Sequence, residues 1–160
     1  MKQKLGLACA LVHTPELLLL DEPTNGVDPV SRREFWDLLY NLVEEGLSIV
    51  LTTAYLDEAE RCHRLAFMDR GRITATGTPG EITAMIPGGV ESFPSPEPFG
   101  DSERIAAAGG ISTVFGSEVH VMGGIDYDQM KTALGRDVEL RRIDPSVEDA
   151  FVYLSTVSSG

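Results

Sequence analysis

Two adjacent carboxylates, Asp21 and Glu22, directly follow the apolar run 17–20. A short apolar run without alternation is typical of a strand buried on both faces of a parallel sheet, and open α/β sheets bind ligands beyond the carboxyl ends of their strands. At such a place one carboxylate can hold Mg²⁺, usually through water, while the next directs a water molecule at a phosphate. The alternative is a core strand that ends in two solvated acids.

The elements that would position this pair are predicted from periodicity and from start and stop signals. Asp28 is predicted to cap a helix that has Pro29 in its first turn, and Gly46 is predicted to end it. The first element is a predicted helix over 1–13, with Leu5, Ala8, Cys9 and Val12 on one face. The elements predicted after it are a buried strand over 16–20, a helix over 28–45, a buried strand over 47–52, a short helix over 55–61, a hairpin over 64–76 and a helix over 79–85.

Composition changes at 87–101, where proline and glycine are frequent, and this segment is predicted to be a linker. It divides residues 1–86 from a smaller α+β module over 102–155, which is followed by a tail over 156–160. The module contains no Gly-rich phosphate loop, metal-ligand spacing or nucleophile signature in its sequence, so we expect it to be non-catalytic.

Charge and hydropathy exclude several classes of function. The chain carries a net charge of −12, from 13 basic and 25 acidic residues, which argues against nucleic acid as a partner and against anchoring on anionic lipid. No apolar run approaches the ~20 residues needed to span a bilayer, so direct membrane insertion is not expected. Cys9 and Cys62 lie far apart and indicate neither a disulfide framework nor a metal site.

Several segments resemble the C-terminal half of the ATP-binding subunit of an ABC transporter. The resemblance covers most of the chain, and the segments occur in the family's order. They are 1–8, similar to the helix after the ABC signature; 17–22, similar to the Walker B strand with its catalytic glutamate; 25–29, similar to the D-loop; 52–60, similar to the switch or H-loop; 68–73 and 77–79, similar to the closing strands and turn; and 145–151, similar to the last helix of the C-terminal extension in drug, lipid and polysaccharide exporters.

This resemblance implies an α/β fold: a partial P-loop-NTPase-like parallel sheet with flanking helices, followed by the small α+β module. It assigns Asp21 to the Mg²⁺ shell and Glu22 to the role of general base. Asp28 would couple two ATP sites across a dimer, although a helix N-cap is an equally good interpretation. Ala54 stands where the family has the H-loop histidine that contacts the γ-phosphate.

The implied function is that of an ATPase subunit that uses ATP and Mg²⁺ to power export through a separate membrane subunit. The subunit would pair head to tail with a second ATP-binding subunit and lie in the cytoplasm, peripheral to the inner face of the cell membrane. The 160 residues contain no GxxxxGK[ST] P-loop, Q-loop or LSGG motif, so by themselves they are expected to be inactive. The alternative is therefore a truncated, non-catalytic interaction fragment that does not bind nucleotide.

Overall fold

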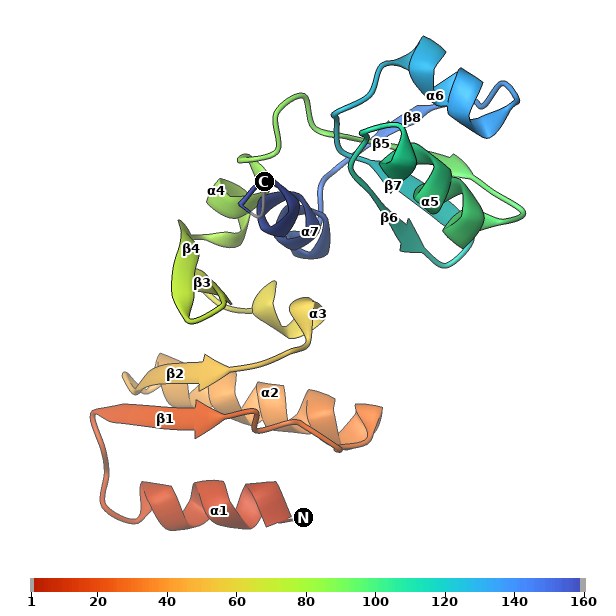
Figure 1. Ribbon diagram of the computed structural model, residues 1–160. Helices are drawn as coiled ribbons and strands as arrows, with labels where there is room; N and C mark the ends of the chain where they lie inside the picture. The colour runs from red at the N-terminus through yellow and green to blue at the C-terminus, as the bar shows by residue number, and fades with distance from the viewer. Residues whose placement is uncertain (1, 159–160) are drawn as a thin grey trace. The chain divides into compact units, whose positions relative to one another are not determined.

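The computed structural model describes residues 2–158, without the side chains of residues 2–4, and has mixed α/β content (Figure 1). The chain divides into two compact units, one ending at Tyr55 and the other beginning at Leu56. The first unit contains four elements: α1 (Lys2–Leu11), β1 (Leu17–Asp21), α2 (Pro29–Glu44) and β2 (Ser48–Thr52).

The strands β1 and β2 form a parallel pair joined through α2. Asp28 accepts hydrogen bonds from the backbone N–H groups of Val30 (3.1 Å) and Ser31 (3.0 Å), so the predicted N-cap is confirmed. At the other end of α2, Gly46 has φ +98°, a conformation that favours glycine. The register places Asp21 opposite Thr52, at the carboxyl ends of both strands.

The burial of the first unit differs from the prediction. In β1, Leu18 is buried, but Leu17 and Leu19 are 51% and 70% exposed, so one face of the strand is open rather than both being covered. The alternation follows from the period of two along a strand. In α1, the buried residue is Leu7, whereas Leu5 of the predicted apolar face is 67% exposed.

The second unit begins with α3 (Leu56–Ala59), the hairpin of β3 (Leu65–Asp69) and β4 (Arg72–Gly77), and α4 (Pro79–Thr83). Arg70 and Gly71 both have positive φ, the signature of a two-residue hairpin turn, so the predicted hairpin is confirmed. The closing helix α7 (Val147–Val157) contacts α3 and α4. The buried residues of this core are Leu65, Phe67, Ala75, Ile82, Ile86, Val90, Met122, Val147 and Ala150.

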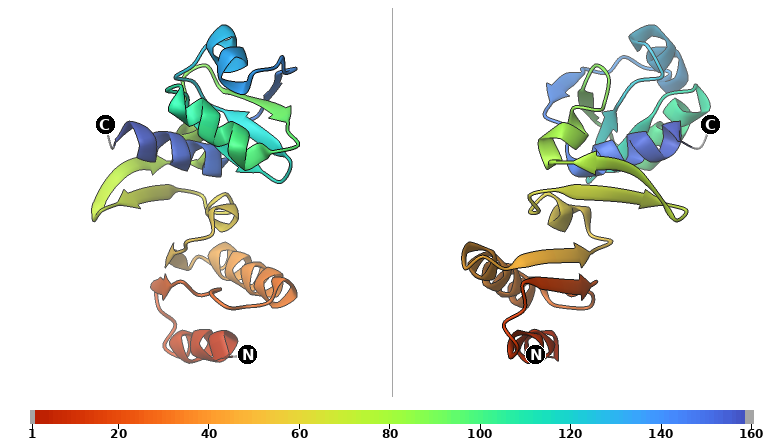
Figure 2. Two further views of the ribbon diagram at one scale, coloured as in Figure 1. Left: turned by 45° about the vertical axis from the view of Figure 1, so that its right-hand side comes forward. Right: turned by 90° about the vertical axis from the view of Figure 1, so that its left-hand side faces the viewer.

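Between α4 and α7 the chain forms a β-α-β-β-α-β arrangement (Figure 2). Its elements are β5 (Val90–Pro94), α5 (Pro98–Ala107), β6 (Ser112–Phe115), β7 (Glu118–Val121), α6 (Tyr127–Leu134) and β8 (Arg141–Ile143). The sheet is antiparallel with the order β6-β7-β5-β8, which is the ferredoxin-like topology. The buried residues of this second core are Phe93, Ile105, Val119, Val121, Met130 and Leu134.

The segment 87–101, predicted to be a linker, instead contains β5 and the start of α5. β5 is an inner strand of the sheet, and Val90 and Phe93 are fully buried. The prolines that suggested a linker occupy positions that tolerate them, since Pro94 ends the strand and Pro98 begins the helix. The α+β module therefore begins at β5 rather than at residue 102.

The helix α7 joins the two cores of the second unit. The backbone N–H of Val147 donates to Glu60 Oε1 at 2.9 Å, across 87 residues of sequence. Asp149 closes the capping box with Ser146, is fully buried, and lies 2.9 Å from His120 Nδ1 of β7. Contacts thus group α3 to α7 together, whereas the sequence divides the chain after residue 86.

Asp101, which is 1% exposed, is a buried carboxylate held by three side chains. Arg104 Nη1 donates to Oδ1 at 2.6 Å. Ser95 Oγ donates to Oδ2 at 2.6 Å, and Arg136 Nη2 donates to the same oxygen. Replacing both arginines by glutamine would leave the charge buried with one hydroxyl partner. We expect the free energy of unfolding, measured by urea denaturation, to fall by about 3–5 kcal/mol.

The charge-matched control replaces two exposed arginines of the hairpin, Arg70 in the turn and Arg72 at the start of β4, by glutamine. We expect its free energy of unfolding to stay within about 0.5 kcal/mol of the parent. Adding Asp101→Asn to the double arginine variant should recover much of the lost stability, because it removes the uncompensated charge. A double arginine variant as stable as the parent would contradict this account.

Candidate functional site

Asp21 and Glu22 lie at the carboxyl end of β1, beside the last residue of β2. Thr52 connects the two: its Oγ1 donates to Asp21 Oδ1 at 2.5 Å, and the backbone N–H of Glu22 donates to Thr52 Oγ1 (3.0 Å) and Thr52 O (3.1 Å). Both carboxylates are exposed. The parallel pairing of β1 with β2 therefore brings the predicted pair and a threonine hydroxyl to one edge of the sheet.

The backbone of Glu22 has φ +42°, a left-handed conformation that is uncommon for a residue with a side chain. Asn25 fixes the loop that follows, since its backbone N–H donates to Glu22 O at 3.1 Å and its side-chain amide donates to Glu22 Oε2 at 3.0 Å. Non-glycine residues held in this region cost of order 1–3 kcal/mol each and cluster at functional sites. This strained, hydrogen-bonded turn aims the Glu22 side chain at a defined position.

Asp28 is placed at the start of α2, where it acts as the helix N-cap. The hydrogen bonds from Ser31 hold the pKa of the Asp28 carboxyl below its usual range, and the backbone N–H of Val30 adds to this effect. The charged form therefore caps the helix at neutral pH. This observation bears out the capping interpretation, and a role in coupling two nucleotide sites stays a prediction.

Ala54 lies in the bend after β2 and is exposed. The neighbouring residues are tied down, since the N–H of Tyr55 donates to Thr53 Oγ1 at 3.0 Å. The guanidinium of Arg32, from α2, lies 4.2 Å from the centre of the Tyr55 ring, within the range of a cation–π contact. The segment around Ala54 thus has a defined backbone next to Thr52 of the carboxylate site.

Comparison with known proteins gives relatives of one kind, although no family model matches the chain. The chain is 35% identical over 160 residues to the Nod factor export ATP-binding protein I of Paraburkholderia xenovorans (strain LB400), covering 97% of this chain and 52% of that protein. It is 51% identical over 83 residues to the probable multidrug ABC transporter ATP-binding protein YbhF of Escherichia coli (strain K12), covering 52% of this chain and 14% of that protein. It is 47% identical over 87 residues to the daunorubicin/doxorubicin resistance ATP-binding protein DrrA of Streptomyces peucetius, covering 54% of this chain and 26% of that protein. The chain belongs to the family of ABC transporter ATP-binding proteins.

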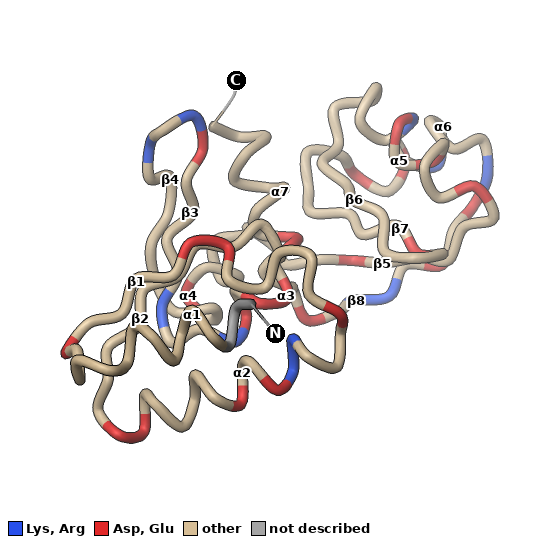
Figure 3. Tube along the Cα trace, turned by 90° about the horizontal axis from the view of Figure 1, so that it is seen from below, with Lys and Arg blue, Asp and Glu red and all other residues tan. Residues whose placement is uncertain are grey.

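This ABC transporter ATP-binding chain spans about half the length of the Nod factor export protein that it matches, and less of the other two relatives. Within residues 2–158, no helix is both long enough and apolar enough to cross a membrane. Acidic positions, red in Figure 3, are spread over both compact units and are not confined to the carboxylate site.

The structure adds three residues that the sequence motifs did not single out. Thr52 connects the Asp21 carboxylate to the backbone N–H of Glu22, Asn25 holds the Glu22 side chain, and Arg32 lies over the Tyr55 ring. Thr52 could have been found from the sequence, because it ends the second predicted strand and the carboxyl ends of parallel strands meet at one edge. That strand, β2, is predicted to be buried but contains no buried residue. The Arg32 contact depends on the course of α2 and has no local signal.

The donor set at the carboxylate pair fits Mg²⁺ that arrives with a phosphate ligand. Mg²⁺ prefers oxygen ligands and is commonly held by one or two carboxylates together with phosphates and water. Asp21 offers such an oxygen donor at the surface. In the part of the chain that the structure describes, no group of three or more His, Cys, Asp and Glu residues could hold a metal ion unaided.

Proposed function

We propose that this chain is part of the ATP-binding and hydrolysing subunit of an ABC-type exporter. The observation that carries the proposal is the pairing of Asp21 and Glu22 at the carboxyl end of a parallel strand, tied together by Thr52. The exporter class is supported by the names of the relatives, which mention Nod factor export, multidrug transport and daunorubicin/doxorubicin resistance.

In this proposal Asp21 holds the Mg²⁺ shell and Glu22 acts as general base. Mg²⁺ supplies charge neutralisation on the phosphates when it is bound. Asn25 engages Glu22 Oε2, so that Oε1 accepts the proton of the water that attacks the terminal phosphate. The strained backbone of Glu22 pre-sets this direction before substrate arrives.

The proposal extends to partners and location. The subunit pairs head to tail with a second ATP-binding subunit through the D-loop around Asp28 and drives a separate membrane subunit. It therefore works in the cytoplasm at the inner face of the cell membrane. The acidic surface, with a net charge of −12, supports a protein partner over nucleic acid.

The function is tested in a hybrid protein in which these 160 residues replace the segment of the Paraburkholderia xenovorans protein that aligns with them. The hybrid protein is expected to bind Mg-ATP and release phosphate in a coupled assay. A hybrid protein that folds and binds Mg-ATP but releases no phosphate would contradict the assignment of a hydrolytic site to these residues.

Replacing Ala54 by histidine in the hybrid protein is expected to raise the turnover number, because an imidazole at this exposed position would supply a contact to the γ-phosphate. Steady-state ATPase rates measure the effect. The matched control is Ala54→Asn, which adds a polar side chain without an imidazole. A loss of more than about tenfold in Ala54→His, ~1.4 kcal/mol in barrier, would mean that Ala54 is not the H-loop position.

A further inference from the structure

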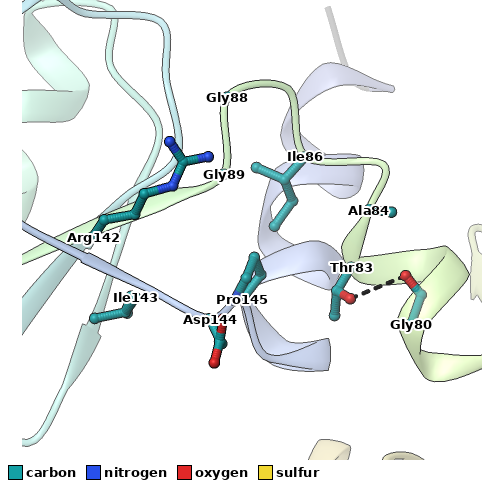
Figure 4. Close-up of a pocket in the computed structure, with 10 residues that line it drawn as sticks. All are labelled: Gly80, Thr83, Ala84, Ile86, Gly88, Gly89, Arg142, Ile143, Asp144 and Pro145. Carbon is teal, nitrogen blue, oxygen red and sulfur yellow. Dashed lines mark hydrogen bonds between the residues drawn. The ribbon is translucent and has the colours of Figure 1, made fainter.

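A pocket of about 400 Å³ opens in the second unit between α4 and the segment that joins β8 to α7 (Figure 4). Its apolar surface comes from Ile86, which is 4% exposed, together with Ile143 and Pro145. One rim is the glycine pair Gly88–Gly89, and the charged residues at the pocket are Arg142 and Asp144. The volume lies within the range of small-molecule sites.

Arg142 carries the charge that a ligand could use. Among the described residues its guanidinium makes no hydrogen bond or ion pair, whereas the neighbouring Arg141 binds Glu118 at 2.8 Å. A Cβ atom built on Gly89 would lie 3.2 Å from Arg142 Nη2, so the missing side chain gives the guanidinium its place against the rim. Figure 4 shows the Arg142 side chain extending toward Gly88 and Gly89.

Asp144 and the apolar wall limit the charge and shape of the occupant. Asp144 points away from Arg142 in Figure 4, at the opposite side of the pocket beside Pro145. A carboxylate there disfavours a second negative charge on the ligand. Ile86 and Pro145 offer apolar surface to a ligand body that lies beside Arg142 (Figure 4).

We propose that this pocket binds a small amphipathic monoanion, with its acidic group on Arg142 and its apolar body against Ile86 and Pro145. A carboxylate accepts two parallel N–H bonds from a guanidinium, which gives both strength and orientation. The site is distinct from the carboxylate pair at residues 21–22, and it stands independently of the hydrolytic function.

The test is a titration of the ¹⁵N-labelled full chain with sodium hexanoate, followed by amide NMR shifts. The amides of Gly88, Gly89 and Asp144 are expected to shift and saturate, with a dissociation constant on the order of 1 mM for a ligand of this size. Arg142→Gln should weaken binding at least about tenfold. Because the Arg142 guanidinium makes no hydrogen bond or ion pair with the described residues, and the substitution keeps the backbone pairing with β5, this variant is expected to fold like the parent.

Arg141→Gln is the charge-matched control, one residue away on the same strand, and should bind hexanoate like the parent. Hexyl phosphate, which carries about −1.5 to −2 charges at pH 7, should bind more weakly than hexanoate because of Asp144. Acetate, which lacks the apolar body, should bind more weakly as well. Hexanol or hexylamine that shifts the same amides as strongly as hexanoate would overturn the proposal. Equal affinity of the parent and Arg142→Gln for hexanoate would overturn it as well.

Discussion

Glu22→Gln in the hybrid protein is expected to lower the turnover number of ATP hydrolysis by roughly 10²–10⁴-fold, the usual contribution of a general base. The amide keeps the shape of the side chain and an oxygen that can accept from Asn25, but it cannot take a proton from water. The backbone hydrogen bonds from Glu22 to Thr52 are unaffected. Nucleotide binding, measured by calorimetry, should therefore remain close to that of the parent.

Glu44→Gln, at the exposed end of α2, is the charge-matched control and should hydrolyse ATP at the parental rate. Asp21→Asn separates the roles of the two carboxylates. This variant should weaken Mg²⁺-dependent nucleotide binding, whereas Glu22→Gln should affect the proton-transfer step and leave binding intact. Turnover in Glu22→Gln within a few-fold of the parent would remove Glu22 from the mechanism and leave its strained backbone without a catalytic explanation.

Phe93→Ala is expected to lower the free energy of unfolding by about 3–5 kcal/mol, the cost of emptying a fully buried aromatic site. Phe93 lies on the inner strand β5 and packs in the core with Ile105 and Val119. Thermal and urea unfolding followed by circular dichroism measure the effect. The amide hydrogens of the sheet should also exchange with solvent faster than in the parent.

Phe99→Ala is the matched control within the same proline-rich segment, since Phe99 is 72% exposed; its change should stay within about 0.5 kcal/mol. The pair distinguishes two descriptions of residues 87–101. If the segment is a linker, both variants should be neutral, and if β5 is a structural strand, only Phe93→Ala should destabilise. Equal stability of the two variants would contradict the ferredoxin-like arrangement.

Local chemistry made much of the site predictable. Asp21 and Glu22 stand out because two carboxylates end an apolar run, and Asp28 because a capping residue precedes Pro29. The hairpin turn at Arg70 and Gly71 also depends on neighbouring residues alone. The resemblance to ABC ATP-binding subunits, stated from these motifs, is confirmed by the relatives.

Contacts between distant residues could not be obtained in this way. The hydrogen bond between Glu60 and Val147, the ion pair of Asp101 with Arg136, and the inner position of β5 each require segments that are far apart in sequence. Proline and glycine reflect the local preference of the backbone. The same residues occur in linkers and at the ends of buried strands, so their presence does not distinguish the two.

The carboxylate pair, the helix cap, the turn and the family could all be predicted from the sequence, because each depends on residue types within a few positions of one another. The folded chain was needed to find that Arg32 lies over Tyr55, that residues 90–94 form an inner strand of a sheet, and that Arg142 faces an open pocket. The physical reason is that burial and pairing are properties of surfaces brought together by the whole chain, and a local pattern does not specify its partner.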